Sequence, residues 1–290
     1  MKQFARILAR SLAGAGLLWV ATTHAADGVA FLTDVKGEVK VDGAPRPALM
    51  SELAKGQKLV LGKHASVAVM FIQSGEEVVL KGPGEFDIDK SGKAINKSGQ
   101  TGEIAARKTD WKISSQALVK VSQTSSASIR MRSINPGAGN QDTKVGALLY
   151  PVRGSIATLQ PVLSWQSTGA SAHDVSLALA SEPDKPIAAG RATGTSHKFS
   201  TRLKPDTEYV WTVNAGGTEL GRGKFRTLSA DAIAEVEKRK PADKAAFSDR
   251  LLYAIMLNDL GVTQDAQALW AKLGAERTDL PELAALGKAK

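Results

Sequence analysis

The sequence predicts a mainly β protein with a C-terminal α-helical segment, and three observations support this fold class. Residues 26–89 and 148–228 each contain short runs in which apolar and polar residues alternate between glycine-containing turns, which is typical of strands. Residues 229–290 change to apolar residues at helical spacing. With 290 residues the chain exceeds one average domain, so more than one core is expected.

The first 25 residues have the layout of a secretory signal peptide. Basic residues precede a short apolar run that ends at Val20, and Thr23 and Ala25 place small residues three and one positions before a cleavage site at Ala26. The run is about half of the roughly 20 residues that cross a bilayer, and no later stretch approaches that length. We therefore expect an exported, periplasmic protein. The absence of cysteine excludes disulfides, thiolate metal sites and attachment through a lipidated Cys.

Residues 26–89 predict a compact β module. Apolar and polar residues alternate over 29–41, and the Asp42-Gly43 pair that follows is a strong hairpin signal. Further short runs follow at 58–62, 66–72, 77–80 and 85–89. Strands this short and this close together favour a β-sandwich or a coiled β-roll.

The order of these motifs resembles the FecR-type periplasmic domain. The matching segments are Val-Lys-Gly-Glu-Val (35–39), Leu-Ala-Lys-Gly-Gln-Lys-Leu (53–59), Val-Ala-Val-Met-Phe (67–71) and Ser-Gly-Glu-Glu-Val-Val-Leu (74–80). Gln57 stands where the family usually has Asp, and Ser74-Gly75 replaces an Asp-Gly turn. The resemblance implies an exported β module. Family members that regulate iron uptake also carry an anti-sigma segment and a transmembrane helix, which have no counterpart here.

Residues 90–147 are expected to form a basic segment and linker. Over 90–132, nine Lys and Arg stand against only Glu103 and Asp110, so the positive charge of the chain is concentrated there. Residues 117–121 and 127–131 are candidate strands, and 133–146 read as a flexible connector.

The basic segment has two interpretations. It could bind an anionic envelope polymer, lipid headgroups or an acidic protein face, with contacts from Arg107, Lys108, Lys112, Lys120, Arg130 and Arg132. The alternative, which the scattered spacing of the charges favours, is a solvated linker. Trp111 is the only aromatic residue of the segment, so no nucleic-acid partner is expected.

Residues 148–228 predict a second β-sandwich. The segment Leu203-Lys-Pro-Asp-Thr-Glu-Tyr209-Val-Trp211 is similar to the E–F corner of a fibronectin type III domain. The resemblance implies that the Tyr209 hydroxyl bonds to the backbone upstream and that Trp165, from an early strand, lies in the core. The structural signature consists of Trp165, Leu203, Tyr209 and Trp211.

Residues 229–290 predict helices. Ser229 is expected to cap a helix that runs to Lys238, a second helix runs from 245 to 260 and ends at Gly261, and a third begins at Thr263 or Asp265. Pro281 begins a short final turn. The pair over 246–281 is similar to a single tetratricopeptide repeat, and one such repeat cannot bury its own apolar face. It is therefore expected to dock on another element, another copy or a partner. Its apolar stripe, with Tyr253 and Trp270, is expected in the core, and an exposed docking groove is the alternative.

Two acidic motifs are expected to be structural. Asp87 and Asp89 imitate the start of a calcium loop, but Ser98 occupies the position of the bidentate Glu. Glu76 and Glu77 are neighbours on a strand, so they face opposite sides and are expected at a solvated turn.

No motif for catalysis is recognised, and we expect a protein that is not an enzyme and has no cofactor. His64, His173 and His197 lack metal-site spacing and are expected at the surface. The serines show neither a Gly-x-Ser-x-Gly elbow nor a Ser-x-x-Lys motif.

The observations together favour an exported binding or scaffold protein of the bacterial cell envelope. It would act through its FecR-like and fibronectin type III-like modules on a protein partner or a cell-wall polymer. The alternative is a periplasmic component of a FecR-like signal-sensing pathway without its own membrane anchor. A third class, an envelope hydrolase, has no visible site.

Overall fold

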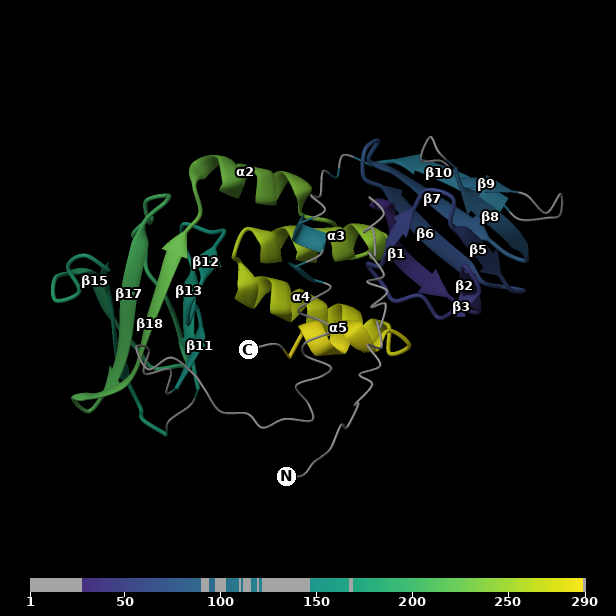
Figure 1. Cartoon of the computed structure of the whole chain (residues 1–290). Helices are drawn as coiled ribbons and strands as arrows, with labels where there is room; N and C mark the ends of the chain where they lie inside the picture. Colours follow the sequence, from purple (N-terminus) through teal and green to yellow (C-terminus); the bar gives the residue numbers. More distant parts are fainter. Residues whose placement is uncertain are drawn as a thin grey trace, which may run out of the picture.

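The computed structural model describes residues 28–89, 94–96, 103–109, 111, 116–118, 120–121, 147–166 and 169–288. The protein is mainly β with helices at the C-terminus, which confirms the predicted fold class. Figure 1 shows two β units with the helices between them. The predicted signal peptide, residues 1–25, lies outside the described residues.

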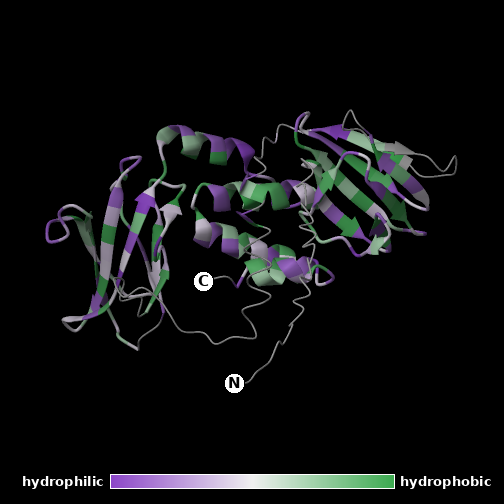
Figure 2. Ribbon diagram, viewed as in Figure 1, coloured by the Kyte–Doolittle hydropathy of each residue, from purple (hydrophilic) through white to green (hydrophobic). Residues whose placement is uncertain are grey.

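The first β unit is a sandwich of two antiparallel sheets, each five-stranded over the described residues. The inner sheet, with the order β10-β7-β6-β1-β4, contains β1 (Gly28–Lys36), β4 (Glu52–Ala54), β6 (Ser66–Phe71), β7 (Glu76–Lys81) and β10 (Glu103–Lys108). The outer sheet, with the order β3-β2-β5-β8-β9, contains β2 (Val39–Val41), β3 (Ala44–Pro45), β5 (Lys58–Leu61), β8 (Gly84–Ile88) and β9 (Ala94–Asn96). Hydrophobic and hydrophilic residues alternate along several of these strands (Figure 2).

The inner sheet is covered on both faces. On β1, Leu32 points into the sandwich core, whereas its neighbour Phe31 packs with residues of the helices. On β6, Val69 likewise points into the sandwich core and Met70 packs with residues of the helices. Burial on both faces explains why β1 and β6 contain near-continuous apolar runs instead of strict alternation.

The Asp42-Gly43 pair makes the turn that the sequence predicts. Both residues have positive φ, 48° and 81°, and Val41 pairs with Ala44 across the hairpin. Positive φ at both central residues is the requirement of a type I′ turn, which glycine meets without strain.

Part of the basic segment belongs to the folded core. β9 and β10 complete the two sheets, although the sequence pattern indicated a linker there. The candidate strand at 117–121 is wrong, because 116–118 and 120–121 are helical. Ala117, Leu118 and Val121 are spaced as one face of a helix and pack into the helical core. The candidate strand at 127–131 lies outside the described residues.

The second β unit is also a sandwich. Its smaller sheet has the order β11-β13-β16 and contains β11 (Leu148–Tyr150), β13 (Val162–Trp165) and β16 (Ser196–Lys198). Its larger sheet has the order β12-β18-β17-β14-β15 and contains β12 (Ser155–Ile156), β14 (His173–Leu179), β15 (Pro186–Ala192), β17 (Glu208–Ala215) and β18 (Thr218–Thr227). All strand pairs are antiparallel except β12 with β18.

The helical region follows the predicted boundaries closely, with α2 (Ala230–Arg239), α3 (Phe247–Asp259), α4 (Thr263–Glu276) and α5 (Pro281–Leu286). The Ser229 side chain caps α2 by accepting from the backbone N–H of Ala232, and Gly261 follows α3 with a φ of 76°. Within the described part of the chain, no helix is long and apolar enough to span a bilayer.

The helices bury their shared apolar face on the first sandwich. Trp270, Leu251 and Leu252 form one buried cluster with Phe31 and Met70 of the inner sheet. Tyr253 and Trp270 are 9% and 1% exposed, as expected of core residues. The element on which the helical pair docks is therefore the first sandwich.

Candidate functional site

The structure describes three of the six predicted basic contact residues. Arg107 and Lys108 end β10, and Lys120 lies in the helical stretch near residue 118. The side chains of Lys108 and Lys120 are exposed. Lys112, Arg130 and Arg132 lie outside the described residues.

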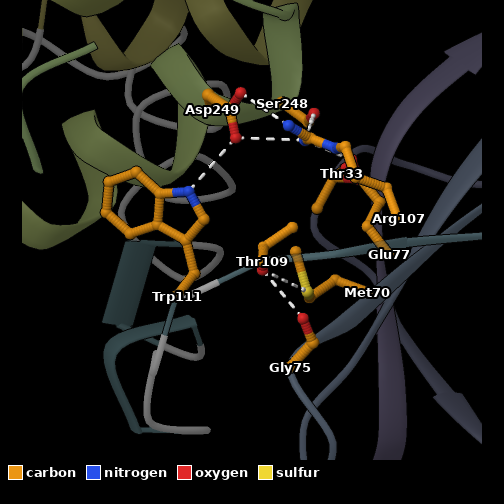
Figure 3. Close-up of polar contacts among 9 residues, drawn as sticks. All are labelled: Thr33, Met70, Gly75, Glu77, Arg107, Thr109, Trp111, Ser248 and Asp249. Atoms are coloured by element: carbon orange, nitrogen blue, oxygen red, sulfur yellow. Dashed lines mark hydrogen bonds and ion pairs between the residues drawn. The ribbon is translucent and has the colours of Figure 1, made fainter.

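Arg107 joins the first sandwich to α3 through two carboxylates. Its Nη2 and Nε donate to Oε2 of Glu77 at 2.5 and 3.1 Å, and its Nη1 and Nη2 donate to the two oxygens of Asp249 at 2.8 and 3.0 Å. Nη2 also lies 3.2 Å from the Ser248 hydroxyl, which accepts. The second oxygen of Glu77 accepts from Thr33 at 2.8 Å. Figure 3 shows this arrangement, which we call the Arg107 clamp.

Strand pairing and a helix start bring these residues together. Arg107 lies directly opposite Glu77 in the antiparallel pair of β10 and β7, where side chains of opposite charge stabilise each other. Asp249 lies in the first turn of α3, where a carboxylate is also favoured by the helix dipole. Glu77 is only 2% exposed, so the prediction of a solvated turn is wrong for this residue. A buried carboxylate needs such a partner.

The electrostatics of the clamp keep Arg107 charged. The hydrogen bond with Asp249, followed by that with Glu77, raises the pKa of Arg107 above its ordinary value, against the opposing effect of burial. One guanidinium thus forms charge-assisted hydrogen bonds with two carboxylates. The hydrogen bonds of Arg107 to Glu77 and Asp249 hold β10 and β7 of the first sandwich against the start of α3.

Trp111 extends the clamp toward α2. Its Nε1 donates to Asp249 at 3.2 Å, and the Arg239 guanidinium lies 5.3 Å from the centre of its ring, within cation–π range. Arg239 also forms an ion pair with Glu235 one turn earlier on α2. Beside Trp111 is a cleft of about 270 Å³ lined by Arg107, Thr109, Trp111, Lys238, Arg239, Pro241, Ala245 and Asp249.

A second arginine clamps the same end of the helical pair to β1. Arg277, which follows α4, forms an ion pair with Asp34 and donates to the carbonyl oxygen of Val35 at 2.7 Å. Its guanidinium lies 5.1 Å from the centre of the Phe247 ring and also binds Asp279. Hydrogen bonding with Asp279 and then Asp34 raises the pKa of Arg277, so this Arg277 clamp is charged at every working pH. No local pattern in the sequence predicts the contact between Arg277 and Asp34, because the two residues are 243 positions apart.

The second sandwich is attached to the opposite end of the same helices. Gln264 accepts from the backbone N–H of Val152 at 2.6 Å and donates to the carbonyl of Leu149 at 3.0 Å. The carbonyl of Gly261 accepts from the N–H of Ser155 at 2.9 Å. The helical region is therefore hydrogen-bonded to both β units, which lie on either side of it (Figure 1).

The four signature residues of the second sandwich lie in its core. Trp165, Leu203, Tyr209 and Trp211 are at most 3% exposed. The Tyr209 hydroxyl accepts from the backbone N–H of Lys204 at 2.9 Å, which is the upstream contact that the sequence led us to expect. Trp211 Nε1 donates to the carbonyl of Pro151 at 2.6 Å.

The histidines do not meet in one site. His64 is exposed and His197 is half-buried, but His173 is only 2% exposed, so its expected surface position is wrong. It packs 5.3 Å from the Trp165 ring because it shares the inward face of β14 with Val175 and Leu177. Over the described residues, no group of His, Cys, Asp and Glu is placed to hold a metal ion.

Comparison with known proteins finds no family model that matches the chain and no matching curated protein. The contacts described above form two clamps and a set of hydrogen bonds that hold three parts of the chain together.

Proposed function

We propose that the protein is an exported, non-enzymatic binding or scaffold protein of the bacterial cell envelope, acting through its FecR-like and fibronectin type III-like modules. Its partner would be a protein or a cell-wall polymer. The resemblance of residues 26–89 to FecR-type domains and the layout of residues 1–25 support an envelope location.

The observation that carries the proposal is the attachment of one helical unit to both sandwiches. The two arginine clamps hold the first sandwich, and Gln264 and Gly261 hold the second. The outer strands of both sandwiches are consequently exposed to a partner in fixed relative positions. A scaffold needs this geometry, because two surfaces held at a set distance bind a common partner with a high effective concentration.

For an anionic partner, the contacts proposed are Lys108, Lys112, Lys120, Arg130 and Arg132. Arg107 is removed from the predicted set because its guanidinium is bonded to Glu77 and Asp249. Lys108 and Lys120 support the proposal because their side chains are exposed beside the inner sheet and the helical core. Contacts of this kind weaken with salt, since exposed charges are screened.

Two experiments test the location and the partner. Cell fractionation with an antibody to the full chain should place a processed form, shortened at its N-terminus, in the periplasmic fraction. Insoluble peptidoglycan should pull down the mature protein at low salt, and replacing the five basic residues by Gln while keeping Arg107 should abolish this. A control with Gln at five other exposed lysines, at positions 36, 55, 63, 185 and 198, should bind normally. If neither added salt nor the first set of substitutions weakened the binding, the proposal that these basic residues bind an anionic polymer would be refuted.

The alternative function is a component of a FecR-like signal-sensing pathway without its own membrane anchor. The resemblance of the first module favours it. Affinity purification of the full chain from envelope extracts distinguishes the two functions, because a membrane receptor or a sigma-factor regulator would co-purify only in the signalling case.

A further inference from the structure

The edge strands of the sheets differ in how well they are protected. Over the described residues the four sheets have eight edge strands, and six of them are only two or three residues long. Short or charged edges discourage pairing with another chain. β10 is longer, but it ends in Arg107 and Lys108. β15 has seven residues with a single charged side chain, that of Arg191, and is therefore the edge with the least protection.

β15 is open to solvent. It is the last strand of the larger sheet of the second sandwich, and Figure 1 shows it on the side away from the helices. Ala189 and Arg191 are exposed, and Ile187 is 43% exposed. Pro186 and the bulge that leaves Ile187 out of the ladder protect only the start of the strand. Residues 188–192 consequently form a regular edge on which all side chains except that of Arg191 are small.

The hydrogen bonds of the sheet decide which backbone groups of β15 face outward. The N–H of Ala180 donates to the carbonyl of Glu208 at 3.0 Å, which continues the register of β14 with β17. In an antiparallel sheet, residues that bond to one neighbouring strand alternate with residues that bond to the other. β14 therefore bonds to β15 through its odd-numbered residues, which pair with residues 188, 190 and 192. The N–H and C=O groups of Ala189 and Arg191 consequently point away from β14, and no other described residue bonds to them.

We propose that β15 pairs with β15 of a second copy of this chain and forms a two-fold dimer. With Gly190 on the axis, Ala189 of each copy lies opposite Arg191 of the other, and the outward N–H and C=O groups of both residues form four hydrogen bonds across the interface. The two Gly190 residues form the non-hydrogen-bonded pair, in which the Cα atoms approach to about 4.5 Å and no side chain interferes. The five-stranded sheets of the two copies join into one continuous sheet.

The strand itself disfavours other registers. An axis at Arg191 would place two arginines directly opposite each other, which is unfavourable. An axis at Ala189 would require Ile187 to pair, and this residue is bulged out of the ladder. The remaining register is self-complementary and crowded by no large side chain, so the edge fits a second copy. The dimer goes beyond the proposed function and does not depend on it.

Sedimentation equilibrium on the full mature chain tests the proposal. The dimer is expected to be weak, with a dissociation constant of about 0.1–1 mM, because one pair of strands buries far less than the roughly 1,200 Å² of a stable interface. Loading concentrations from about 20 µM to about 1 mM should therefore show a monomer–dimer equilibrium. A single monomeric species over this range would overturn the proposal. Assemblies larger than a dimer would also overturn it, since a two-fold pairing closes at two copies.

Substitutions of Ala189 test the register without removing a bond between β14 and β15. Ala189→Glu places a carboxylate opposite Arg191 of the second copy and should tighten the dimer about fivefold, whereas Ala189→Lys should weaken it by a similar factor. Equal dimerisation of these two variants would overturn the register.

A third substitution tests the outward hydrogen bonds. Ala189→Pro removes an outward N–H and should abolish the dimer, and proline is tolerated where the N–H of an edge strand faces solvent. The control Ala189→Ser keeps the N–H and should dimerise like the wild type. A dimer that persists in Ala189→Pro would overturn the assignment of the interface to β15.

Discussion

Replacing Arg107 by Met should destabilise the protein by leaving a buried acid without its partner. The Glu77 side chain is 3% exposed and would retain only the Thr33 hydroxyl. Breaking a buried ion pair typically costs about 3–5 kcal/mol. The Arg107 side chain is 43% exposed, so part of the charge is already screened by water. We therefore expect a loss of about 2–3 kcal/mol in the free energy of unfolding, measured by urea denaturation at pH 7.

A second substitution separates the buried charge from the lost contact. In Arg107→Met with Glu77→Gln, the buried group is neutral and can still accept from Thr33. The double variant should therefore be more stable than Arg107→Met alone, by about 1 kcal/mol or more. The matched control is Arg226→Met, because Arg226 and its partner Asp206 are both more than half exposed. Exposed pairs of this kind contribute about 0–1 kcal/mol.

Two results would refute this reasoning. If Arg107→Met cost no more than Arg226→Met, the clamp would be an ordinary surface pair. If the double variant were less stable than the wild type by the sum of the losses of Arg107→Met and Glu77→Gln measured singly, the cost would not arise from an uncompensated charge on Glu77.

Three further predictions concern other contacts. Arg277→Met should lower the unfolding free energy by about 2–3 kcal/mol in the same urea assay, because Arg277 and Asp34 are only 11% and 17% exposed; a loss below that of Arg226→Met would count against this. Tyr209→Phe should cost about 1 kcal/mol, since it leaves the N–H of Lys204 without its acceptor, and an unchanged urea midpoint would show that the corner is not needed. Burial raises the pKa of Asp265, so the folded chain binds the carboxyl proton more tightly than the unfolded chain does. As the pH falls from about 7 through this raised pKa toward the ordinary value of 3.8, the free energy of unfolding of the wild type should therefore increase relative to that of Asp265→Asn. The opposite trend in parallel urea titrations would contradict the burial of that acid.

Local signals in the sequence were sufficient for several elements. The Asp42-Gly43 turn, the cap at Ser229 and the stop at Gly261 each depend on residues a few positions apart, and all three are found in the structure. The Tyr209 corner spans five residues and is also found. Such features are predictable because one residue type satisfies one backbone conformation or one hydrogen bond.

The contacts that build the candidate site could not be predicted in this way. β10 is an edge strand whose side chains from 104 to 108 are exposed, so it lacks the alternation that marks a half-buried strand. Without β10, nothing relates Arg107 to Glu77, and the partner Asp249 lies 142 residues further along the chain.

Two further signals in the sequence concern the faces of strands. The continuous apolar run of β6 indicates a strand buried on both faces, which would have predicted a docking face for the helices. His173 stands two and four residues before Val175 and Leu177, so its inward position follows from the period of a strand. Both signals concern the face on which a residue lies, and neither identifies the partner that covers it.

The central claim is that the helical unit holds the two sandwiches in one fixed arrangement. The chain contains no cysteine, so Lys63→Cys in the first sandwich and Glu182→Cys in the second allow a spin label to be placed on each. Pulsed electron–electron double resonance on this doubly labelled protein should give one narrow distance distribution, which broadens when Arg107→Met and Arg277→Met are introduced together. A broad or multiple distribution in the protein with both clamps intact would contradict the claim.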